Sequence, residues 1–266
     1  MQSEMNKTDL TDVTFIVPLR IDSEVRKENL EMVISFLQTN LNTTIMVLEA
    51  DKDEKYLPAD GVLKTFIKDE DPVFHHSKYR NVLIRKAVTE YICLWDADAI
   101  GPVNQIIAAR DMLRDKKADL VFPYDGKYYN VPGVIKNVYK EMPDVEVFLK
   151  NIDKLRLMHG IHSVGGAIMI NREVYMKAGM ENEKFYGWSP EDYERIIRCE
   201  ILGYRIARVD GPLFHLEHAR GKNSWFFSDE TNIKARKEFL NVCRMNPEEL
   251  WEYVNEGMKI MKRMKE

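Results

Sequence analysis

Apolar residues follow two spacings along this chain, and each spacing predicts a different element. Short apolar runs rich in β-branched residues predict strands, whereas apolar residues that recur every three or four positions predict helices. In the first half, strands are predicted at residues 13–17, 45–48, 62–67, 91–95 and 120–122, with Pro18 ending the first. Helices are predicted between them at residues 30–41, 77–89 and 102–113. This alternation predicts an α/β fold with a doubly wound, mainly parallel sheet.

The second half has a less regular pattern. Residues 127–133 predict an irregular excursion, and residues 144–158 predict a helix with its apolar residues on one face. Further strands are predicted at residues 167–170 and 204–209, and further helices at residues 171–179 and 189–202. The tail, residues 229–266, predicts two helices, the second of which starts near Pro247.

Composition narrows the class of protein. The chain has 266 residues and a formal net charge of -4, so it lacks the basic excess that nucleic-acid-binding proteins carry. Residues 1–10 are polar and no apolar stretch approaches ~20 residues, so we expect neither a secretory signal nor a membrane span. The cysteines Cys93, Cys199 and Cys243 are isolated and are expected to be buried free thiols. These features predict a cytoplasmic globular protein.

Asp96 and Asp98 come directly after the predicted strand at residues 91–95. The carboxyl ends of strands are where open α/β sheets bind their ligands. Two carboxylates one residue apart repel each other unless a cation lies between them, and a hard divalent cation that also holds a phosphate suits this position. The alternative is a turn with two solvated carboxylates, and the spacing alone does not decide between the two.

His215 and His218 follow a predicted strand near the same edge of the sheet. A spacing of three residues brings both rings to one side of a helical turn, and a tight loop also makes them converge. Imidazole favours a transition metal such as manganese over calcium. The alternative is a surface or hydrogen-bonded pair, which is the commoner role of two neighbouring histidines. Elsewhere in the chain, His76 is expected to face a phosphate.

Residues 185–192 combine aromatic side chains with an acidic helix start. A serine cap, a proline in the first turn, and then Glu191 and Asp192 describe a stable helix N-terminus. In a functional interpretation, Tyr186 and Trp188 form a wall on which a sugar ring stacks, and the two carboxylates bind its hydroxyls. The pattern does not choose between these interpretations. Basic residues elsewhere, such as Arg20 and Arg80, either contact phosphates or are simply exposed to solvent.

The order of these motifs resembles that of the inverting glycosyltransferases with the GT-A fold. It looks closest to the branch that contains the β-1,4-galactosyltransferases and the bacterial chondroitin-polymerase-type transferases. The matching segments are residues 15–20, 74–81, 96–98, 164–166, 185–192 and 215–220, and the tail has no counterpart. The resemblance implies a Rossmann-like, doubly wound mixed sheet followed by a C-terminal helical tail.

The resemblance also implies a metal site and a catalytic base. Asp98 and His218 correspond to metal ligands of the family, and His215 lies at the position of another. Asp96 is expected to serve the metal or the nucleotide, and the cofactor is expected to be Mn²⁺ or Mg²⁺. Asp192 corresponds to the aspartate that removes the proton from the acceptor hydroxyl.

Binding residues for both substrates are implied in the same way. For the nucleotide they are Arg20, Glu49, Asp51, His76, Lys78, Asn81 and Asp96. For the acceptor sugar they are Gly165, Gly166, Tyr186, Trp188, Glu191 and Asp192. The chain departs from the family pattern where Ser189 and Pro190 replace the more usual glycines, and where His76 replaces the arginine of some relatives.

The implied function is metal-dependent transfer of a sugar, with inversion, from a UDP-sugar to a hydroxyl of a saccharide or glycolipid acceptor. A catalytic domain is expected at residues 1–228, with a nucleotide-sugar half at about 1–124 and an acceptor half at about 125–228. The helical extension, residues 229–266, is expected to pack on this domain, and the alternative is that its basic segment 259–265 lies on the inner face of a membrane.

Two other classes of protein remain. One is a non-catalytic sugar-binding module of the same fold, although the intact Asp98, Asp192 and His218 argue against it. The other is a nucleotidyltransferase, which ordinarily has a glycine-rich phosphate loop near its first strand. Residues 18–22 contain no glycine.

Overall fold

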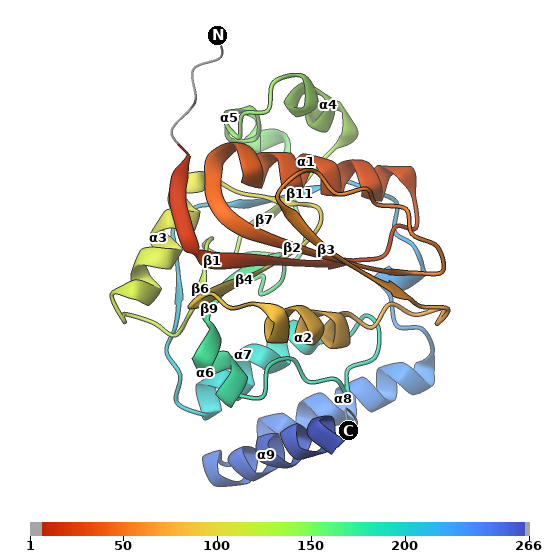
Figure 1. The fold of residues 1–266 in the computed structure, drawn as a ribbon, viewed down its shortest axis with the longest axis vertical. Helices are drawn as coiled ribbons and strands as arrows, with labels where there is room; N and C mark the ends of the chain where they lie inside the picture. Colours follow the sequence, from red (N-terminus) through yellow and green to blue (C-terminus); the bar gives the residue numbers. More distant parts are fainter. Residues whose placement is uncertain (1–6, 264–266) are drawn as a thin grey trace.

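The central sheet has seven strands in the order β10-β6-β9-β4-β1-β2-β3. It is seen in a computed structural model that describes residues 7–263 of the chain (Figure 1). The strands are β1 (Thr8–Leu19), β2 (Leu41–Asp51), β3 (Val62–Lys68), β4 (Tyr91–Trp95), β6 (Leu120–Phe122), β9 (Ala167–Asn171) and β10 (Ile206–Arg208). β9 runs antiparallel to β4 and β6, and the other pairs are parallel. The predicted mixed, mainly parallel sheet is therefore confirmed.

Helices cover both faces of this sheet. They are α1 (Glu24–Asn40), α2 (His76–Lys86), α3 (Val103–Arg114), α6 (Arg172–Lys177) and α7 (Glu191–Ile201). Figure 1 shows α1 and α2 on opposite sides of the strands. Because both faces are covered, residues 13–19 of β1 are all buried, and all of them except Thr14 are apolar. α1 begins before its apolar stripe because the Ser23 side chain accepts a hydrogen bond from the Arg26 N–H at 3.3 Å and caps it.

β1 is longer than predicted and contains Pro18. This proline aligns with Leu48 of β2, whereas the pairing of β1 with β4 ends at Ile16. Proline lacks the N–H of a ladder hydrogen bond, so it is tolerated where one neighbouring strand has already ended. β1 therefore continues to Leu19 and places Arg20 at its carboxyl end.

A second sheet has four short strands in the order β5-β11-β7-β8. They are β5 (Ala99–Ile100), β7 (Tyr128–Val131), β8 (Arg156–Leu157) and β11 (Leu213–Leu216). The prediction of an irregular excursion at residues 127–133 is wrong, because β7 pairs in parallel with β11 along its whole length. A partner so distant in the chain leaves no trace in the local pattern.

The predicted helix at residues 144–158 is also wrong. Helix α4 (Gly133–Glu141) precedes this segment, which holds α5 (Glu146–Leu149), the 3-10 turn η1 (Ile152–Lys154) and β8. The Asn151 side chain donates to the Val147 carbonyl at 2.9 Å and closes the first turn. Val147, Phe148 and Leu155 are all buried, so these short elements satisfy the same apolar spacing as one helix.

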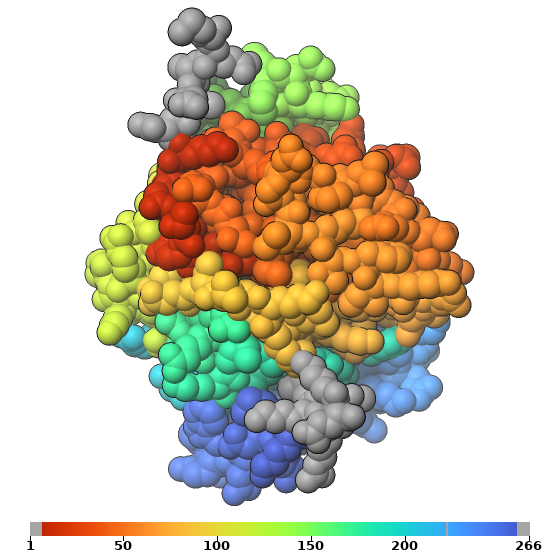
Figure 2. Space-filling model, viewed as in Figure 1, coloured from red at the N-terminus to blue at the C-terminus, as the bar shows by residue number. Residues whose placement is uncertain are grey.

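Two helices, α8 (Asp229–Arg244) and α9 (Pro247–Arg263), follow the short turn η2 (Lys222–Ser224), as predicted for the tail. Val242 of α8 forms a small buried cluster with Leu250 and Val254 of α9, against the end of α7. Figures 1 and 2 show these helices at one end of the molecule. The basic segment 259–265 was the one with an alternative location on a membrane surface. Its residues 264 and 265 lie outside the described residues.

Other features of composition are placed by the structure. Cys93 and Cys199 are buried, Cys243 is partly buried, and all three are free thiols. None of the helices within residues 7–263 has the length and apolar character needed to cross a membrane. Residues 1–6, which belong to the polar N-terminal segment, lie outside the described residues.

Candidate active site

Strand pairing in the second sheet brings Asp98 and the two histidines together. Asp98 immediately precedes β5, and β5 pairs antiparallel with β11 so that Ala99 lies opposite His215. The Leu216 N–H also donates to the Asp98 carbonyl at 2.8 Å. His215 thus lies on a strand and His218 in the loop after it. The two rings converge through this strand and loop, and a helical turn plays no part.

Asp98, His215 and His218 form a group that can hold a metal ion. One ligand atom from each lies within 4.8 Å of the other two. Asp98 Oδ2 is 3.2 Å from His218 Nε2 and 3.8 Å from His215 Nε2. Adjacent ligands of a small octahedral cation, each ~2.1 Å from it, are themselves ~3 Å apart. The spacing of these donors therefore suits such an ion.

Hydrogen bonds to the two rings leave the correct nitrogens free for a metal. His215 Nδ1 lies 2.9 Å from Asn130 Oδ1, and His218 Nδ1 lies 2.8 Å from the Ala219 carbonyl. Because both partners are acceptors, each Nδ1 carries the hydrogen and each Nε2 keeps its lone pair. Burial lowers the pKa of His215 to about 4, although the Asp98 charge acts in the opposite direction. The His215 ring is therefore neutral at neutral pH, as a metal ligand must be.

Arg26 also contacts this group. Burial raises the pKa of Asp98, but the His215 and His218 rings and the Arg26 guanidinium outweigh burial and hold it well below its ordinary value. Arg26 Nη1 lies 3.3 Å from Asp98 Oδ2 and 2.9 Å from His218 Nε2. Sequence reasoning missed Arg26, because its position on α1 does not distinguish it from a solvating arginine.

Asp96 is not one of the three residues of this group, and its role as a further metal ligand or as a nucleotide contact stays a prediction. Its carboxylate lies 3.2 Å from Arg80 Nη2, and the group of mutually close ligand atoms consists of the other three residues. β4 ends at Trp95, so the turn that follows no longer keeps residues i and i+2 on one face. Burial raises the pKa of Asp96, while the Arg80 charge opposes this shift.

The N-terminus of α7 lies in the wall of the same cavity. The N-cap residue is Pro190 and no side chain caps the helix, so the predicted Ser189 cap is wrong. The Ser189 hydroxyl instead lies 2.9 Å from Glu191 Oε2, to which it donates. Burial and the Asp192 charge raise the pKa of Glu191 to about 8. Glu191 is therefore protonated at neutral pH and can donate a hydrogen bond.

The two oxygens of the Asp192 carboxylate have different surroundings. Oδ1 accepts hydrogen bonds from Arg80 at 3.0 Å and from Arg195 at 2.7 Å. Oδ2 faces Gly165, where a Cβ atom would lie only 3.0 Å from it. Burial raises the pKa of Asp192, but Arg195 and Arg80 outweigh burial and lower it. The carboxylate is thus ionised and anchored through one oxygen.

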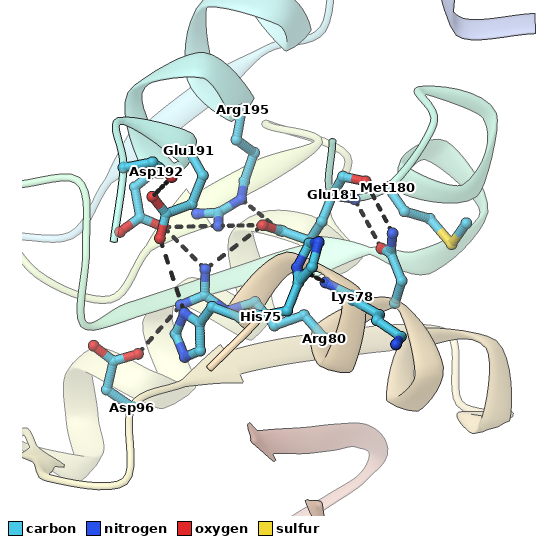
Figure 3. Close-up of polar contacts among 12 residues, drawn as sticks. His75, Lys78, Arg80, Asp96, Met180, Glu181, Glu191, Asp192 and Arg195 are labelled. Atoms are coloured by element: carbon cyan, nitrogen blue, oxygen red, sulfur yellow. Dashed lines mark hydrogen bonds and ion pairs between the residues drawn. The ribbon is translucent and has the colours of Figure 1, made fainter. Parts of the chain in front are cut away.

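A buried network supports this carboxylate (Figure 3). Arg80 reaches Asp96 at 3.2 Å and Glu181 at 3.6 Å in addition to Asp192. Arg195 makes a two-point contact with Glu181, at 2.8 and 2.9 Å. Figure 3 shows both guanidinium groups among the three carboxylates. Sequence reasoning missed Glu181 and Arg195, although the spacing of Asp192 and Arg195 on one helix was an available signal.

A cavity of about 620 Å³ connects these groups. Of the residues predicted for the site, its wall contains His76, Asp96, Asp98, Gly165, Gly166, Trp188, Glu191, Asp192, His215 and His218. Gly166 has φ +86°, and a Cβ atom there would approach the Leu213 side chain to 2.7 Å and the Tyr128 ring to 2.8 Å. Only glycine both adopts this positive φ readily and leaves room for the Leu213 and Tyr128 side chains.

Several residues predicted to contact the nucleotide are not among the described residues that line this cavity. Two of them make structural hydrogen bonds. Glu49 is fully buried and accepts hydrogen bonds from the backbone N–H groups of Lys55 and Tyr56, at 2.8 and 3.1 Å. Asn81 is fully buried and both donates to and accepts from the backbone of Glu181, at 2.9 Å each. These contacts engage both side chains in the fold, and their roles in nucleotide binding stay predictions.

The remaining predicted residues are not among the described residues that line the cavity. Arg20 pairs with Asp69 at 2.6 Å and donates to the Ala50 carbonyl at 2.9 Å. Asp51 pairs with Lys55 at 2.8 Å. Lys78 is exposed. The Tyr186 hydroxyl donates to the Asp71 carboxylate. Tyr186 is not among the described residues that line the cavity. Their roles in binding stay predictions.

Comparison with known proteins identifies the fold. No protein-family model matches the chain, and no curated protein matches its sequence. TarS of S. aureus, solved with UDP-GlcNAc, has 14% identity and a TM-score of 0.56, over 92% of this chain and 71% of TarS residues 1–349. Glucosyl-3-phosphoglycerate synthase from Mycobacterium tuberculosis, solved with Mn²⁺, UDP and phosphoglyceric acid, has 15% identity and a TM-score of 0.52, over 90% of this chain and 80% of that one.

A third similarity is partial. The catalytic domain of Drosophila β1,4-galactosyltransferase 7 has 16% identity and a TM-score of 0.47, over 76% of this chain and 64% of that one. This chain therefore spans less than two thirds of that domain. The first two similarities show that the fold is the GT-A fold, in agreement with the resemblance in the sequence.

Proposed function

We propose that this chain is a glycosyltransferase that moves a sugar from a UDP-sugar to a hydroxyl of a saccharide acceptor, with inversion and with a bound divalent cation. One observation carries the proposal: a single cavity contains both the group of Asp98, His215 and His218 and the carboxylate of Asp192. The reaction needs a cation site for a diphosphate and a base for a hydroxyl within reach of each other. Structural neighbours solved with UDP or UDP-GlcNAc support this interpretation.

Asp98, His215 and His218 would hold the cation, which is Mn²⁺ or Mg²⁺ in our proposal. An ionised carboxylate and imidazoles whose Nε2 lone pairs are free form a fitting donor set. When bound, the cation acts as a Lewis acid on the leaving diphosphate. Asn130 and the Ala219 carbonyl orient the two rings, as partners behind metal ligands commonly do.

Asp192 is the proposed base. Arg80 and Arg195 hold Oδ1 and leave Oδ2 to accept the proton of an acceptor hydroxyl. The hydroxyl oxygen then attacks the anomeric carbon on the face opposite the leaving diphosphate, and a single displacement inverts its configuration. A positioned base contributes ~10²–10⁴-fold to such a rate.

Glu191 and Trp188 are proposed to bind the acceptor. Protonated Glu191 can donate a hydrogen bond to a sugar oxygen. The Trp188 ring packs against Phe226 and Trp225, with ring centroids 4.8 and 6.3 Å away, and forms an aromatic surface for a sugar ring. The glycine at 165 leaves room beside Asp192 Oδ2.

The proposed halves of the catalytic domain, about 1–124 and about 125–228, each contribute to the metal site. Asp98 comes from the first and both histidines come from the second. We keep Arg20, His76, Lys78 and Asp96 as proposed contacts for the nucleotide, and a cytoplasmic location as a proposal.

A screen of UDP-sugars for Mn²⁺-dependent release of UDP tests the function. We expect release with at least one donor, and we expect Asp192→Asn to lose it while still binding UDP. Asp53→Asn, which neutralises an exposed carboxylate outside the cavity, is the matched control. Binding of UDP without turnover of any donor would favour a sugar-binding module. Normal turnover by Asp192→Asn would remove this residue from the role of base.

A further inference from the structure

Arg26 lies against two of the three atoms that form the candidate metal site. Its Nη1 is 2.9 Å from His218 Nε2 and 3.3 Å from Asp98 Oδ2. It belongs to the first turn of α1, and its side chain, 26% exposed, lines the same cavity. A guanidinium has no acceptor atom, so it can only donate to these two atoms.

His218 offers a single lone pair for this contact. Its Nδ1 lies 2.8 Å from the Ala219 carbonyl, which can only accept, so Nδ1 carries the ring hydrogen. The lone pair is therefore on Nε2. It accepts a hydrogen bond from Arg26 or binds a metal ion, but it cannot do both.

Like charge strengthens this competition. An ion ~2.1 Å from His218 Nε2 lies within about 5 Å of Arg26 Nη1, because that nitrogen is itself 2.9 Å from the same atom. Two cations so close in a largely buried site repel each other. Arg26 must therefore turn away when the ion binds. Asp22, four residues earlier and just before the N-cap of α1, has a carboxylate oxygen 3.9 Å from Arg26 Nε, and a bound diphosphate offers a stronger anion.

We infer that Arg26 competes with the divalent cation for His218 and Asp98, and that a nucleoside diphosphate relieves the competition by pairing with the displaced guanidinium. The cation alone then binds weakly, and the diphosphate strengthens its binding beyond the effect of their direct contact. The competition follows from the geometry alone, whereas the part played by the diphosphate rests on the proposed function.

Titration of the full chain with Mn²⁺ alone, followed by the electron paramagnetic resonance signal of the free ion, tests the competition. Arg26→Met and its control Lys27→Met remove the same charge from adjacent positions of α1. We expect Arg26→Met to bind Mn²⁺ about tenfold more tightly than the wild type, and Lys27→Met to change the affinity far less. Equal effects of the two variants, or weaker binding by Arg26→Met, would overturn the competition.

The same titration with saturating UDP tests the second part. With UDP bound, we expect Arg26→Met to bind Mn²⁺ no more tightly than the wild type. The coupling between UDP and Mn²⁺ is then about tenfold smaller in Arg26→Met than in the wild type. If Arg26→Met still bound Mn²⁺ about tenfold more tightly than the wild type in the presence of UDP, the role of the diphosphate would be overturned. If UDP binds to no variant, the proposed function fails, and the titration with Mn²⁺ alone still decides the competition.

A crystal structure of the wild type with Mn²⁺ keeps the inference testable if Arg26→Met does not fold. We expect the ion on His218 Nε2 and the Arg26 guanidinium turned away from it. An ion bound beside Asp98 while Arg26 still contacts His218 Nε2 would contradict the inference.

Discussion

At the scale of single residues, Glu191 and Asp192 show how tertiary contacts decide chemistry that the sequence leaves open. Both carboxyl groups lie in the first turn of α7. Asp192 receives two guanidinium groups, whereas Glu191 receives a serine hydroxyl and has the Asp192 charge beside it. One group is therefore an anion suited to accept a proton, and the other is a neutral acid suited to donate a hydrogen bond.

Glu191→Gln should change how stability depends on pH. Burial and the Asp192 charge raise the pKa of Glu191 from 4.5 to about 8, so folding favours the protonated carboxyl. This stabilisation is complete below about pH 4.5 and is lost as the pH rises to about 8, at up to ~1.4 kcal/mol per pH unit. Glutamine is neutral throughout. In urea titrations, the free energy of unfolding of the variant should therefore rise relative to the wild type from about pH 5 to about pH 8.

Glu141→Gln, at the exposed end of α4, is the control for this effect. Its pH dependence should run parallel to that of the wild type. If Glu191→Gln also ran parallel, Glu191 would have to be ionised in the folded protein, and its role as a hydrogen-bond donor would fail.

Tyr128 and Tyr124 are a matched pair of buried residues. Within the described part of the chain the Tyr128 hydroxyl has no hydrogen-bond partner, whereas the Tyr124 hydroxyl reaches the Ser163 and Gly165 carbonyls at 2.9 and 2.6 Å. An unsatisfied buried group costs ~1–3 kcal/mol, so Tyr128→Phe should raise the free energy of unfolding by about 1 kcal/mol, and Tyr124→Phe should lower it similarly. Urea unfolding measures both changes. A destabilised Tyr128→Phe would show that its hydroxyl is hydrogen-bonded.

The residues of the site could be predicted from the sequence where a motif sets them apart. Asp98, His215, His218 and Asp192 belong to such motifs, and they line one cavity. Arg26 could not be predicted, because an arginine on a helix usually faces solvent and only the fold shows which one turns inward.

The sequence does not show which polar side chains the fold itself engages. A carboxylate at a strand end can bind a ligand or the N–H groups of the next loop, and Glu49 binds the loop. Asn81 likewise holds the backbone of Glu181. Such residues have the type and position of binding residues, but the sequence does not reveal the backbone groups that they hold in the fold.

At the scale of elements, local periodicity predicts the first half of the fold better than the second. Between residues 13 and 122 each strand is followed by a helix or strand with its own clear pattern. The second sheet consists of strands of two to four residues, which are shorter than a typical strand of ~5–6. Its pairings also depend on distant partners. One of them, β5 with β11, places His215 beside Asp98, so the least predictable sheet forms the metal site.

Leu250 tests whether the C-terminal helices belong to the fold. It lies fully buried on α9, in one cluster with Val254 of the same helix and Val242 of α8. Leu250→Ala should therefore lower the free energy of unfolding by about 2–5 kcal/mol, measured by urea denaturation. Leu240→Ala, at a position of α8 that is 47% exposed, is the control and should have little effect. Deletion of residues 246–266 gives the opposing outcome. If it left stability unchanged and abolished binding to anionic vesicles, the result would favour a membrane-binding role for the C-terminal segment.

At the scale of the whole molecule, the cavity joins parts that fold into different layers. Asp98 follows a strand of the large sheet, His215 lies on a strand of the small sheet, and Asp192 begins a helix. The four side chains of the proposed site, Asp98, Asp192, His215 and His218, come from segments that together span more than a hundred residues of the chain. An ion held by Asp98 and His215 would therefore bind the folded chain and have little affinity for the unfolded one.

Metal removal should consequently be visible in both stability and UDP binding. Mn²⁺ at about a hundred times its dissociation constant should stabilise the folded protein by ~2.7 kcal/mol, and the melting temperature should rise accordingly. His215→Ala should lose this rise, whereas His162→Ala, an exposed histidine outside the described wall of the cavity, should keep it.

In calorimetry, EDTA should abolish UDP binding by the wild type, because the diphosphate then lacks the cation that neutralises it. Equal affinity for UDP in EDTA and in Mn²⁺ would show that the nucleotide binds without the ion, and the proposed mechanism would lose its Lewis acid.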